Sequence, residues 1–331
     1  MPEHRPPHPH EHFAHFHAPP DPALLSTDVG IRAVRRSLAI LLGTAAVQTL
    51  AVAVSGSVAL LADTIHNTGD ALTAIPLWLA FRMARREPNR WFSYGYGRVE
   101  DLAGLAVVVV IAASALLAAY ESVLRFLEPR EISHLGIVAA AALVGFAGNE
   151  AAARIRIKAG RRIASAALIA DGQHARVDAL TSLSVLFGAA GVWLGFPQTD
   201  PIIGLGITGV ICVIAWTAGR AVIGRLIDET DPHVAEEIRL ATNSVPDVQA
   251  VTDVRVRWMG HRLEAEVSIA VDPSLTVQEG HAGALDVRHH LLHHLPHLHY
   301  VTIHVDPADA PGLAHHRIIS HAHDGLPAHS H

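Results

Sequence analysis

The chain has 331 residues, of which 50% are hydrophobic and 17% are charged, and its formal net charge is −6. Its mean hydropathy of +0.29 is high for a soluble protein, so the composition indicates a membrane protein with a soluble part. The single cysteine, Cys212, excludes a disulfide framework and a thiolate metal site within one chain. Histidine is the outlier at 25 residues, and most of it lies outside the apolar segments.

The first 30 residues are rich in Pro and His and have no basic-then-apolar signal pattern. Such a composition cannot bury an apolar core, so we expect residues 1–30 to form a disordered tail. Histidine tracts of this kind can bind metal loosely, but a solvated tail with incidental affinity explains the pattern equally well. The histidines of this tail are His4, His8, His10, His12, His15 and His17.

Six apolar runs follow, each close to the roughly 20 residues that a helix needs to span a bilayer. They cover about 37–55, 58–82, 101–124, 134–153, 164–194 and 201–223. Basic residues gather before the first run, between the second and third, between the fourth and fifth, and after the sixth. By the positive-inside rule this distribution places both termini in the cytoplasm. We expect an all-α, six-helix transmembrane domain over 31–226, in a bacterial inner membrane.

From residue 227 the pattern changes to that of a small soluble domain extending to residue 308. Thr230-Asp231-Pro232 is a typical helix start, and two alternating segments flank a turn at 259–261. The expected elements are a helix to about 243, strands over 251–257 and 263–271, a helix over 276–294 and a strand over 300–305. This αββαβ order predicts a compact α/β domain. Residues 309–331 hold Pro, Gly and six histidines, and predict a second disordered tail.

Two of the apolar runs carry the same acid, imidazole, acid pattern. The polar residues are Asp63, His66 and Asp70 in the second run, and Asp171, His174 and Asp178 in the fifth. Positions i, i+3 and i+7 fall within roughly 60° of one another around a helix, so each copy presents one polar stripe. Because a charge at the bilayer centre costs about 2.5–3.5 kcal/mol, we expect the two stripes to face each other around a cation.

The two histidines and the second aspartate of each copy would supply two nitrogens and two oxygens, a set that suits tetrahedral zinc. The alternative is that these polar residues pack between helices and are satisfied by their neighbours. That explanation serves one isolated histidine or aspartate, but it accounts less well for two copies of H-x-x-x-D.

The six runs, the paired motif and the αββαβ domain together resemble the cation diffusion facilitator family over roughly residues 31–307. This resemblance implies export of divalent transition metals, most often zinc, in exchange for protons. It also implies a homodimer whose cytoplasmic domains have a ferredoxin-like, metallochaperone-like fold. The transport ligands that it implies are His66, Asp70, His174 and Asp178, with Asp63 and Asp171 beside the site or at its entry.

The substrate implied by the resemblance is Zn²⁺, while Cd²⁺, Co²⁺, Ni²⁺ and Fe²⁺ stay open because selectivity within one N/O site depends on geometry. We expect no organic cofactor, no catalytic residues and no nucleic-acid partner. Zinc needs deprotonated ligands and histidine titrates near neutral pH, so binding at this site should release protons. There is no G-x-x-x-x-G-K-[ST] phosphate loop, which favours secondary active transport.

Two charged residues beside the membrane also match family positions. Arg98 and Asp228 resemble a basic and an acidic residue that interlock the family's dimer near the membrane surface. Two unrelated juxtamembrane charges are the alternative. A further loop site of the family, often built from histidines, is not expected, because the corresponding residues are Phe92 and Tyr96.

In the cytoplasmic domain, His281, His304 and Asp306 match metal-binding positions of the family, whereas Thr252 and Ser268 stand where histidines are expected. We therefore expect a single metal site at most, in place of the usual binuclear one. Its other ligands could be His261 or members of a histidine cluster, for which a solvated helix face is an equally good explanation. The cluster comprises His289, His290, His293, His294, His297 and His299.

Two other classes of function stay open. A membrane metalloenzyme would need an open coordination position and an additional acid or base, a role that Asp63, Asp171 or Glu150 could fill. A metal sensor or storage protein could use the His-rich tails, but it would leave the ligands inside the apolar runs unexplained.

Overall fold

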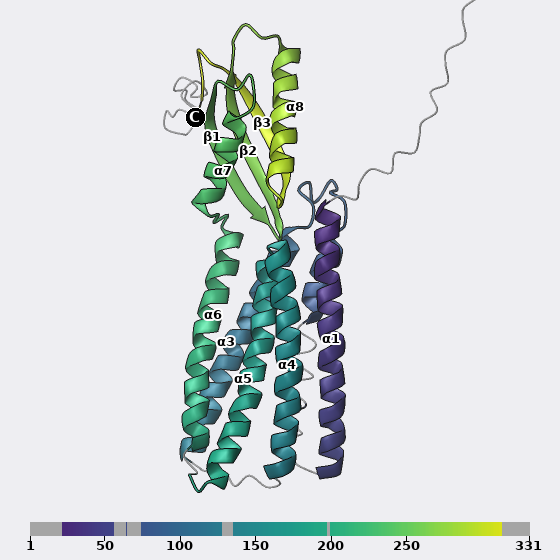
Figure 1. The fold of residues 1–331 in the computed structure, drawn as a ribbon, viewed down its shortest axis with the longest axis vertical. Coiled ribbons are helices and arrows are strands. Elements are labelled where there is room, and N and C mark those ends of the chain that lie inside the picture. Colours follow the sequence, from purple (N-terminus) through teal and green to yellow (C-terminus); the bar gives the residue numbers. More distant parts are fainter. Residues whose placement is uncertain (1–21, 56–63, 65–73, 128–134, 197–198, 313–331) are drawn as a thin grey trace, which may run out of the picture.

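The structure, a computed structural model, describes residues 22–55, 64, 74–127, 135–196 and 199–312. It consists of a bundle of long helices with a small α/β domain at one end (Figure 1). The long helices are α1 (Pro22–Ser55), α3 (Arg98–Leu127), α4 (Leu135–Ile163), α5 (Ala166–Trp193) and α6 (Thr199–Leu226). A shorter apolar helix spans Ala74–Ala84.

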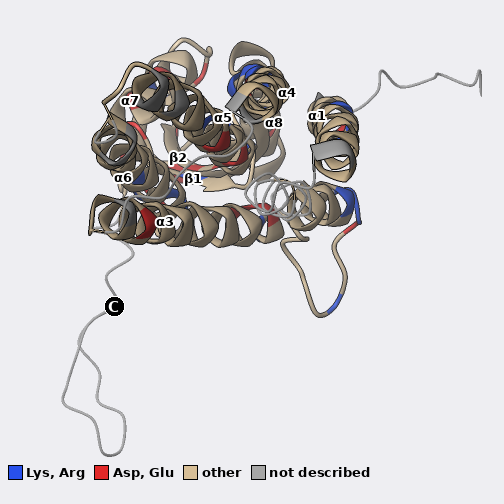
Figure 2. Cartoon of the chain, turned by 90° about the horizontal axis from the view of Figure 1, so that it is seen from below, with Lys and Arg blue, Asp and Glu red and all other residues tan. Residues whose placement is uncertain are grey.

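Three of the described helices are apolar and long enough to cross a membrane by length and composition alone. They contain the segments Leu25–Ala53, Arg98–Leu124 and Ile202–Leu226. Large apolar side chains point outward from the bundle, among them Leu116 and Trp216, which are 73% and 76% exposed. The helices viewed along the bundle are mostly uncharged, with acidic and basic residues confined to short stretches (Figure 2). Lipid is the environment in which such an outer surface is stable.

The observed helices agree with the third, fifth and sixth expected runs to within three residues at each end. Most of the second run lies outside the described residues, so the count of six spans stays a prediction. Two helices are longer than expected. Helix α1 begins at Pro22, inside the expected N-terminal tail, because Thr27 is fully buried where α1 meets the cytoplasmic domain. Helix α4 continues through the basic stretch to Ile163 because Arg156 in that stretch is buried.

The cytoplasmic domain has the αββαβ order that the sequence predicts. Its elements are α7 (Pro232–Asn243), β1 (Ala250–Met259), β2 (Arg262–Val271), α8 (Val277–His294) and β3 (Leu298–Pro307). Strand β2 is central, antiparallel to β1 and parallel to β3. The core joins Ile238 of α7, Val287 and Leu291 of α8, and Val267 and Ile269 of β2.

Both helices of this domain start at sequence-encoded caps. The side chain of Asp231 accepts a hydrogen bond from the backbone N–H of His233, with Pro232 at the first helical position. The start of α8 is a capping box, in which Thr276 and Glu279 each bond the other's backbone N–H. These caps explain why the two helix starts could be located from the sequence.

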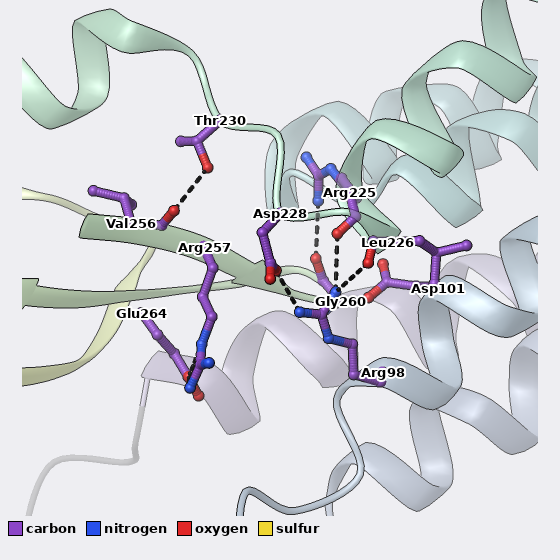
Figure 3. A network of polar contacts seen from close by, with 10 residues as sticks. All are labelled: Arg98, Asp101, Arg225, Leu226, Asp228, Thr230, Val256, Arg257, Gly260 and Glu264. Atoms are coloured by element: carbon purple, nitrogen blue, oxygen red, sulfur yellow. Dashed lines mark hydrogen bonds and ion pairs between the residues drawn. The ribbon is translucent and has the colours of Figure 1, made fainter. Parts of the chain in front are cut away.

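The turn between β1 and β2 is inserted into the end of the helical bundle. The backbone N–H of Gly260 donates to Asp101 Oδ2 at 3.1 Å, and Arg225 donates to the Gly260 carbonyl at 2.9 Å (Figure 3). Next to it, His261 is buried with its Nδ1 2.6 Å from Glu100 Oε2 and its Nε2 3.1 Å from Thr27 Oγ1. One turn of the cytoplasmic domain thus contacts α1, α3 and α6.

Gly260 is required by this junction for two reasons. Its φ of 65° is in the left-handed region, and a Cβ there would lie 2.8 Å from both Glu100 Oε2 and the Gly97 carbonyl oxygen. We predict that Gly260→Ala destabilises the docked arrangement, by about 1–2 kcal/mol from the backbone conformation alone. Hydrogen exchange of the β1–β2 turn, measured by mass spectrometry on the whole protein in detergent, should become faster.

Gly283→Ala is the matched control, because a Cβ at that position in α8 meets open space. That substitution should leave exchange at the β1–β2 turn unchanged, and should stabilise α8 slightly because alanine favours the helix. Equal exchange at the turn in both variants would contradict the role given to Gly260.

Candidate metal site

The polar stripe expected on the fifth run is buried inside the bundle. Asp171, His174 and Asp178 lie on α5 and are 0%, 1% and 3% exposed. One turn separates the last two, and His174 Nδ1 lies 3.9 Å from Asp178 Oδ1. Helix α5 can bury this stripe because it packs against α3, α4 and α6. An imidazole and a carboxylate on one buried face are two ligands that a divalent transition metal accepts.

The other copy of the motif falls where the structure gives no description. Asp63, His66 and Asp70 all lie outside the described residues, and so does most of their helix. Of this segment the structure describes Thr64, which is buried, and the helix Ala74–Ala84. That the two stripes face each other therefore stays a prediction.

Asp171 has a partner that the sequence analysis did not identify. Its Oδ1 lies 3.1 Å from Nη1 of Arg156 on α4, and both side chains are almost completely buried. Arg156 Nε also donates to Ser37 Oγ on α1 at 2.8 Å. The guanidinium thus balances the charge of Asp171, which is what a group beside a metal site, in contrast to a ligand, requires.

The α4 and α5 backbones approach closely beside this ion pair. A Cβ on Gly172 would lie 2.7 Å from Cγ1 and 2.9 Å from the backbone nitrogen of Ile157. Small residues permit such close packing between membrane helices. The glycine therefore lets Arg156 and Asp171, on two different helices, reach each other.

Sequence reasoning missed Arg156 because it belongs to a stretch of five basic residues that resembles a loop. Its neighbour Arg154 faces outward and bonds Glu150, so helical periodicity separates the two arginines. The signal that could have found Arg156 is the acid in the opposite helix, since a buried carboxylate needs a cation or hydrogen-bond donors.

Glu150, considered above as an additional acid or base, is engaged elsewhere. Its carboxylate accepts hydrogen bonds from Arg154 at 2.8 Å and from Arg176 at 3.2 Å. Two guanidinium partners hold this side chain as an ionised carboxylate. It is therefore poorly placed to exchange protons with a metal-bound group.

Arg98 and Asp228 contact each other at the cytoplasmic end of the bundle (Figure 3). Arg98 also donates to the carbonyl oxygens of Arg225 and Leu226, at 2.9 and 3.4 Å, which are the last carbonyls of α6. Asp228 adopts a positive φ of 62° directly after that helix. The pair therefore closes the C-terminus of α6 within one chain, and its part in a dimer stays a prediction.

The expected ligand positions of the cytoplasmic domain form one row across the sheet. Thr252 Oγ1 donates to the Ser268 carbonyl at 3.2 Å, and Ser268 lies opposite His304 in the β2–β3 register. His304 Nε2 lies 2.9 Å from Asp306 Oδ1, and His281 is exposed near the start of α8. Within the described residues, no three His, Cys, Asp or Glu side chains are gathered for a metal ion.

His261 is not available to this row, contrary to the expectation that it could complete a cytoplasmic site. It lies at the β1–β2 turn, at the end of β2 opposite to Asp306, and is buried against Glu100 and Thr27. The same region lowers the pKa of His297, first through burial and then through the positive charges of Arg225 and His261. His261 is therefore a docking residue between the domain and the bundle.

Two family models match this chain. The model described as "Cation efflux transmembrane domain" matches residues 34–227, and that described as "Cation efflux protein, cytoplasmic domain" matches residues 230–308. The chain belongs to the cation efflux family. This confirms the resemblance drawn from the paired motif, and the members of the family are transporters of divalent metal cations.

Relatives of this protein in the family carry several different metal names. The chain is 51% identical over 301 residues to the probable cation efflux system protein Rv2025c of Mycobacterium tuberculosis, covering 91% of this chain and 90% of that protein. It is 26% identical to the magnetosome protein MamB of Magnetospirillum gryphiswaldense, covering 77% and 86%. It is 24% identical to the manganese efflux system protein MneP of Bacillus subtilis, covering 77% and 88%.

Among solved structures, the cytoplasmic domain is similar to the cadmium form of a MamM CTD variant. The identity is 26%, the match covers 23% of this chain and 95% of that chain, and the TM-score is 0.23. The family membership makes this protein an integral membrane transporter of divalent metal cations and not an enzyme. Its cytoplasmic part is the family's dimerisation domain, which supports a homodimer.

The buried ion pair between Arg156 and Asp171 gives a stability prediction. Arg156→Gln or Asp171→Asn alone leaves one buried charge without its partner, which should destabilise the protein by about 3–5 kcal/mol. The double variant carries neither charge, so it should be closer to the parent than either single variant. Thermal unfolding of the detergent-solubilised protein measures all three.

The exposed pair of Arg220 and Glu229 serves as the control. Removing both of its charges should change the unfolding temperature little, because exposed ion pairs contribute little to stability. Additive losses in the Arg156 and Asp171 double variant would show that the two side chains act independently.

Proposed function

We propose that this protein exports zinc from the cytoplasm in exchange for protons, as a homodimeric secondary transporter. The observation that carries the proposal is the burial of His174 and Asp178 one turn apart on α5, in a chain of the cation efflux family. The same residue spacing recurs at His66 and Asp70 in the second apolar run. We further propose a bacterial inner membrane location, with both termini in the cytoplasm.

The four proposed ligands balance the charge of the ion they would hold. Two carboxylates and two neutral imidazoles carry a charge of −2, which a divalent cation neutralises. Asp171 does not enter this sum because Arg156 balances it. The set of His66, Asp70, His174 and Asp178 is therefore electrically complete with one zinc ion, and Asp63 stays a candidate for the entry to the site.

Proton exchange follows from the same ligands. Imidazole and carboxylate must lose their protons before they bind zinc, so the ion and protons compete for one site. When that site opens toward a more acidic compartment, protonation of the ligands weakens zinc binding and favours release. When it opens toward the cytoplasm, the ligands lose protons and bind the next ion.

The preference for zinc rests on the two histidines. Imidazole is a ligand that suits zinc, whereas carboxylates suit harder ions such as manganese. The name of MneP assigns manganese efflux to one relative, so the family's general function does not determine the metal. Cadmium, cobalt, nickel and iron are the other ions that this ligand set would admit.

We propose a division of the chain into a His-rich tail, a transport domain, a cytoplasmic domain and a second His-rich tail. The bounds are 1–30, 31–226, 227–308 and 309–331. The helical residues 22–30 attach the end of the first tail to α1. The family-model matches at 34–227 and 230–308 support the central division.

Transport in reconstituted vesicles tests the proposal. We expect Asp178→Ala to abolish zinc movement driven by a pH gradient, because the variant lacks a charge that balances the ion. Asp286→Ala, which removes an exposed carboxylate of α8, should transport at the parental rate. Parental transport by Asp178→Ala would refute the assignment, provided that both variants reconstitute equally.

Selectivity gives a second prediction. His66→Asp changes the proposed site to one imidazole and three carboxylates, a harder and more negative set. The variant should keep zinc transport but gain manganese or cadmium transport, with a shifted pH profile because one titrating imidazole is lost. Competition assays with zinc and each rival ion in the same vesicles measure this, and an unchanged metal order and pH profile would exclude His66 from the site.

A further inference from the structure

The last two turns of α8 expose four histidines in two pairs. His289 and His293 have ring centroids 4.4 Å apart, and His290 and His294 have nearly parallel rings 5.9 Å apart. All four side chains are exposed. Each pair has the i, i+4 spacing that places two side chains on one face of a helix.

The rotation of α8 about its axis is set by its apolar face. Val287 and Leu291 are completely buried in the core of the cytoplasmic domain, packed on the sheet. The histidines occupy the positions between and after these residues and therefore face away from the core. A folded α8 keeps both pairs together at no additional cost in backbone order.

Two imidazoles at this spacing can hold one transition-metal ion between them. Zinc–nitrogen bonds of about 2.0–2.1 Å in tetrahedral geometry place two ligand nitrogens about 3.3 Å apart. Rings 4.4 Å apart reach that arrangement by side-chain rotation, which exposed residues undergo freely. Because the described residues hold no gathered set of three donors, water would complete each coordination shell.

The surroundings of the second pair are favourable for a cation. His294 Nε2 lies 3.8 Å from Glu237 Oε1 of α7, and Ser244 Oγ lies 3.4 Å from His290 Nε2. A carboxylate within reach adds negative charge and a possible oxygen ligand. Acceptors of this kind raise the affinity of an imidazole pair for a divalent ion.

We propose that the last two turns of α8 bind divalent transition-metal ions through the pairs His289/His293 and His290/His294. This site is distinct from the α5 stripe and from His304 and Asp306. It lies at the end of the cytoplasmic domain nearest the bundle, because β3 starts directly after α8 and runs parallel to β2, which starts at the docked turn (Figure 1). Ions bound there are held next to the cytoplasmic end of the helices.

Two double variants that each remove two imidazoles separate pairwise binding from independent histidines. His289→Ala with His293→Ala removes one pair and leaves the other. His289→Ala with His290→Ala removes one member of each pair, and the remaining neighbours, one residue apart, point in different directions. We expect the first variant to lose about one zinc equivalent and the second about two.

Equilibrium dialysis of the whole protein in detergent against Zn²⁺ measures the number of bound ions. The tails and the transmembrane site contribute equally in every variant, so only differences from the parent count. Hydrogen exchange by mass spectrometry localises the effect. Zinc should slow exchange in the peptide covering the end of α8 in the parent, less in the first variant and not in the second.

Equal losses of zinc in the two double variants would show independent, single-histidine binding and overturn the proposal. So would zinc-independent exchange at the end of α8 in the parent. Thermal unfolding without metal verifies that both variants fold, as exposed positions should allow. Since the readout is binding at α8 and not transport, a negative result leaves the proposed zinc export untouched.

Discussion

Buried charges in an apolar bundle must be balanced, and this constraint accounts for the polar contacts between the described helices. Removing an ion from water costs several kcal/mol even after relaxation, so each buried charge needs an opposite charge or several hydrogen bonds. Arg156 and Asp171 meet this need between α4 and α5, and Glu100 meets it with His261 and Ser165. The pairs also fix which faces of the helices can meet.

The same requirement joins the cytoplasmic domain to the helices. Glu100 and Asp101 lie one after the other at the start of α3 and are both buried, and the β1–β2 turn supplies partners to both. His261 also contacts Thr27 of α1. Since one side chain bonds both α1 and α3, these helices cannot separate at this end without breaking a buried hydrogen bond. The domain is therefore attached to the bundle by specific contacts and not only by the segment after α6.

The elements with a strong local signal could be predicted from the sequence, whereas contacts between helices could not. The cap at Asp231 and the capping box at Thr276 identified both helices of the cytoplasmic domain, and strand alternation located the sheet. The buried stripe on α5 follows from its spacing. The partner of Asp171 does not, because Arg156 has four basic neighbours in the sequence and only the fold selects it. His261 looked like a possible metal ligand for the same reason, since no local pattern reveals a partner 161 residues away.

The charge balance also distinguishes the roles of the aspartates on α5. Asp171 has a permanent cation beside it in Arg156, so a zinc ion there would be repelled by the guanidinium. Asp178, two turns further along the same face, has an imidazole nearby instead, and imidazole is positive only when protonated. The carboxylate whose neighbour can lose its charge is the one able to exchange a proton for a metal ion. This difference follows from the residue that faces each aspartate, and it is why two identical side chains on one helix face have different functions.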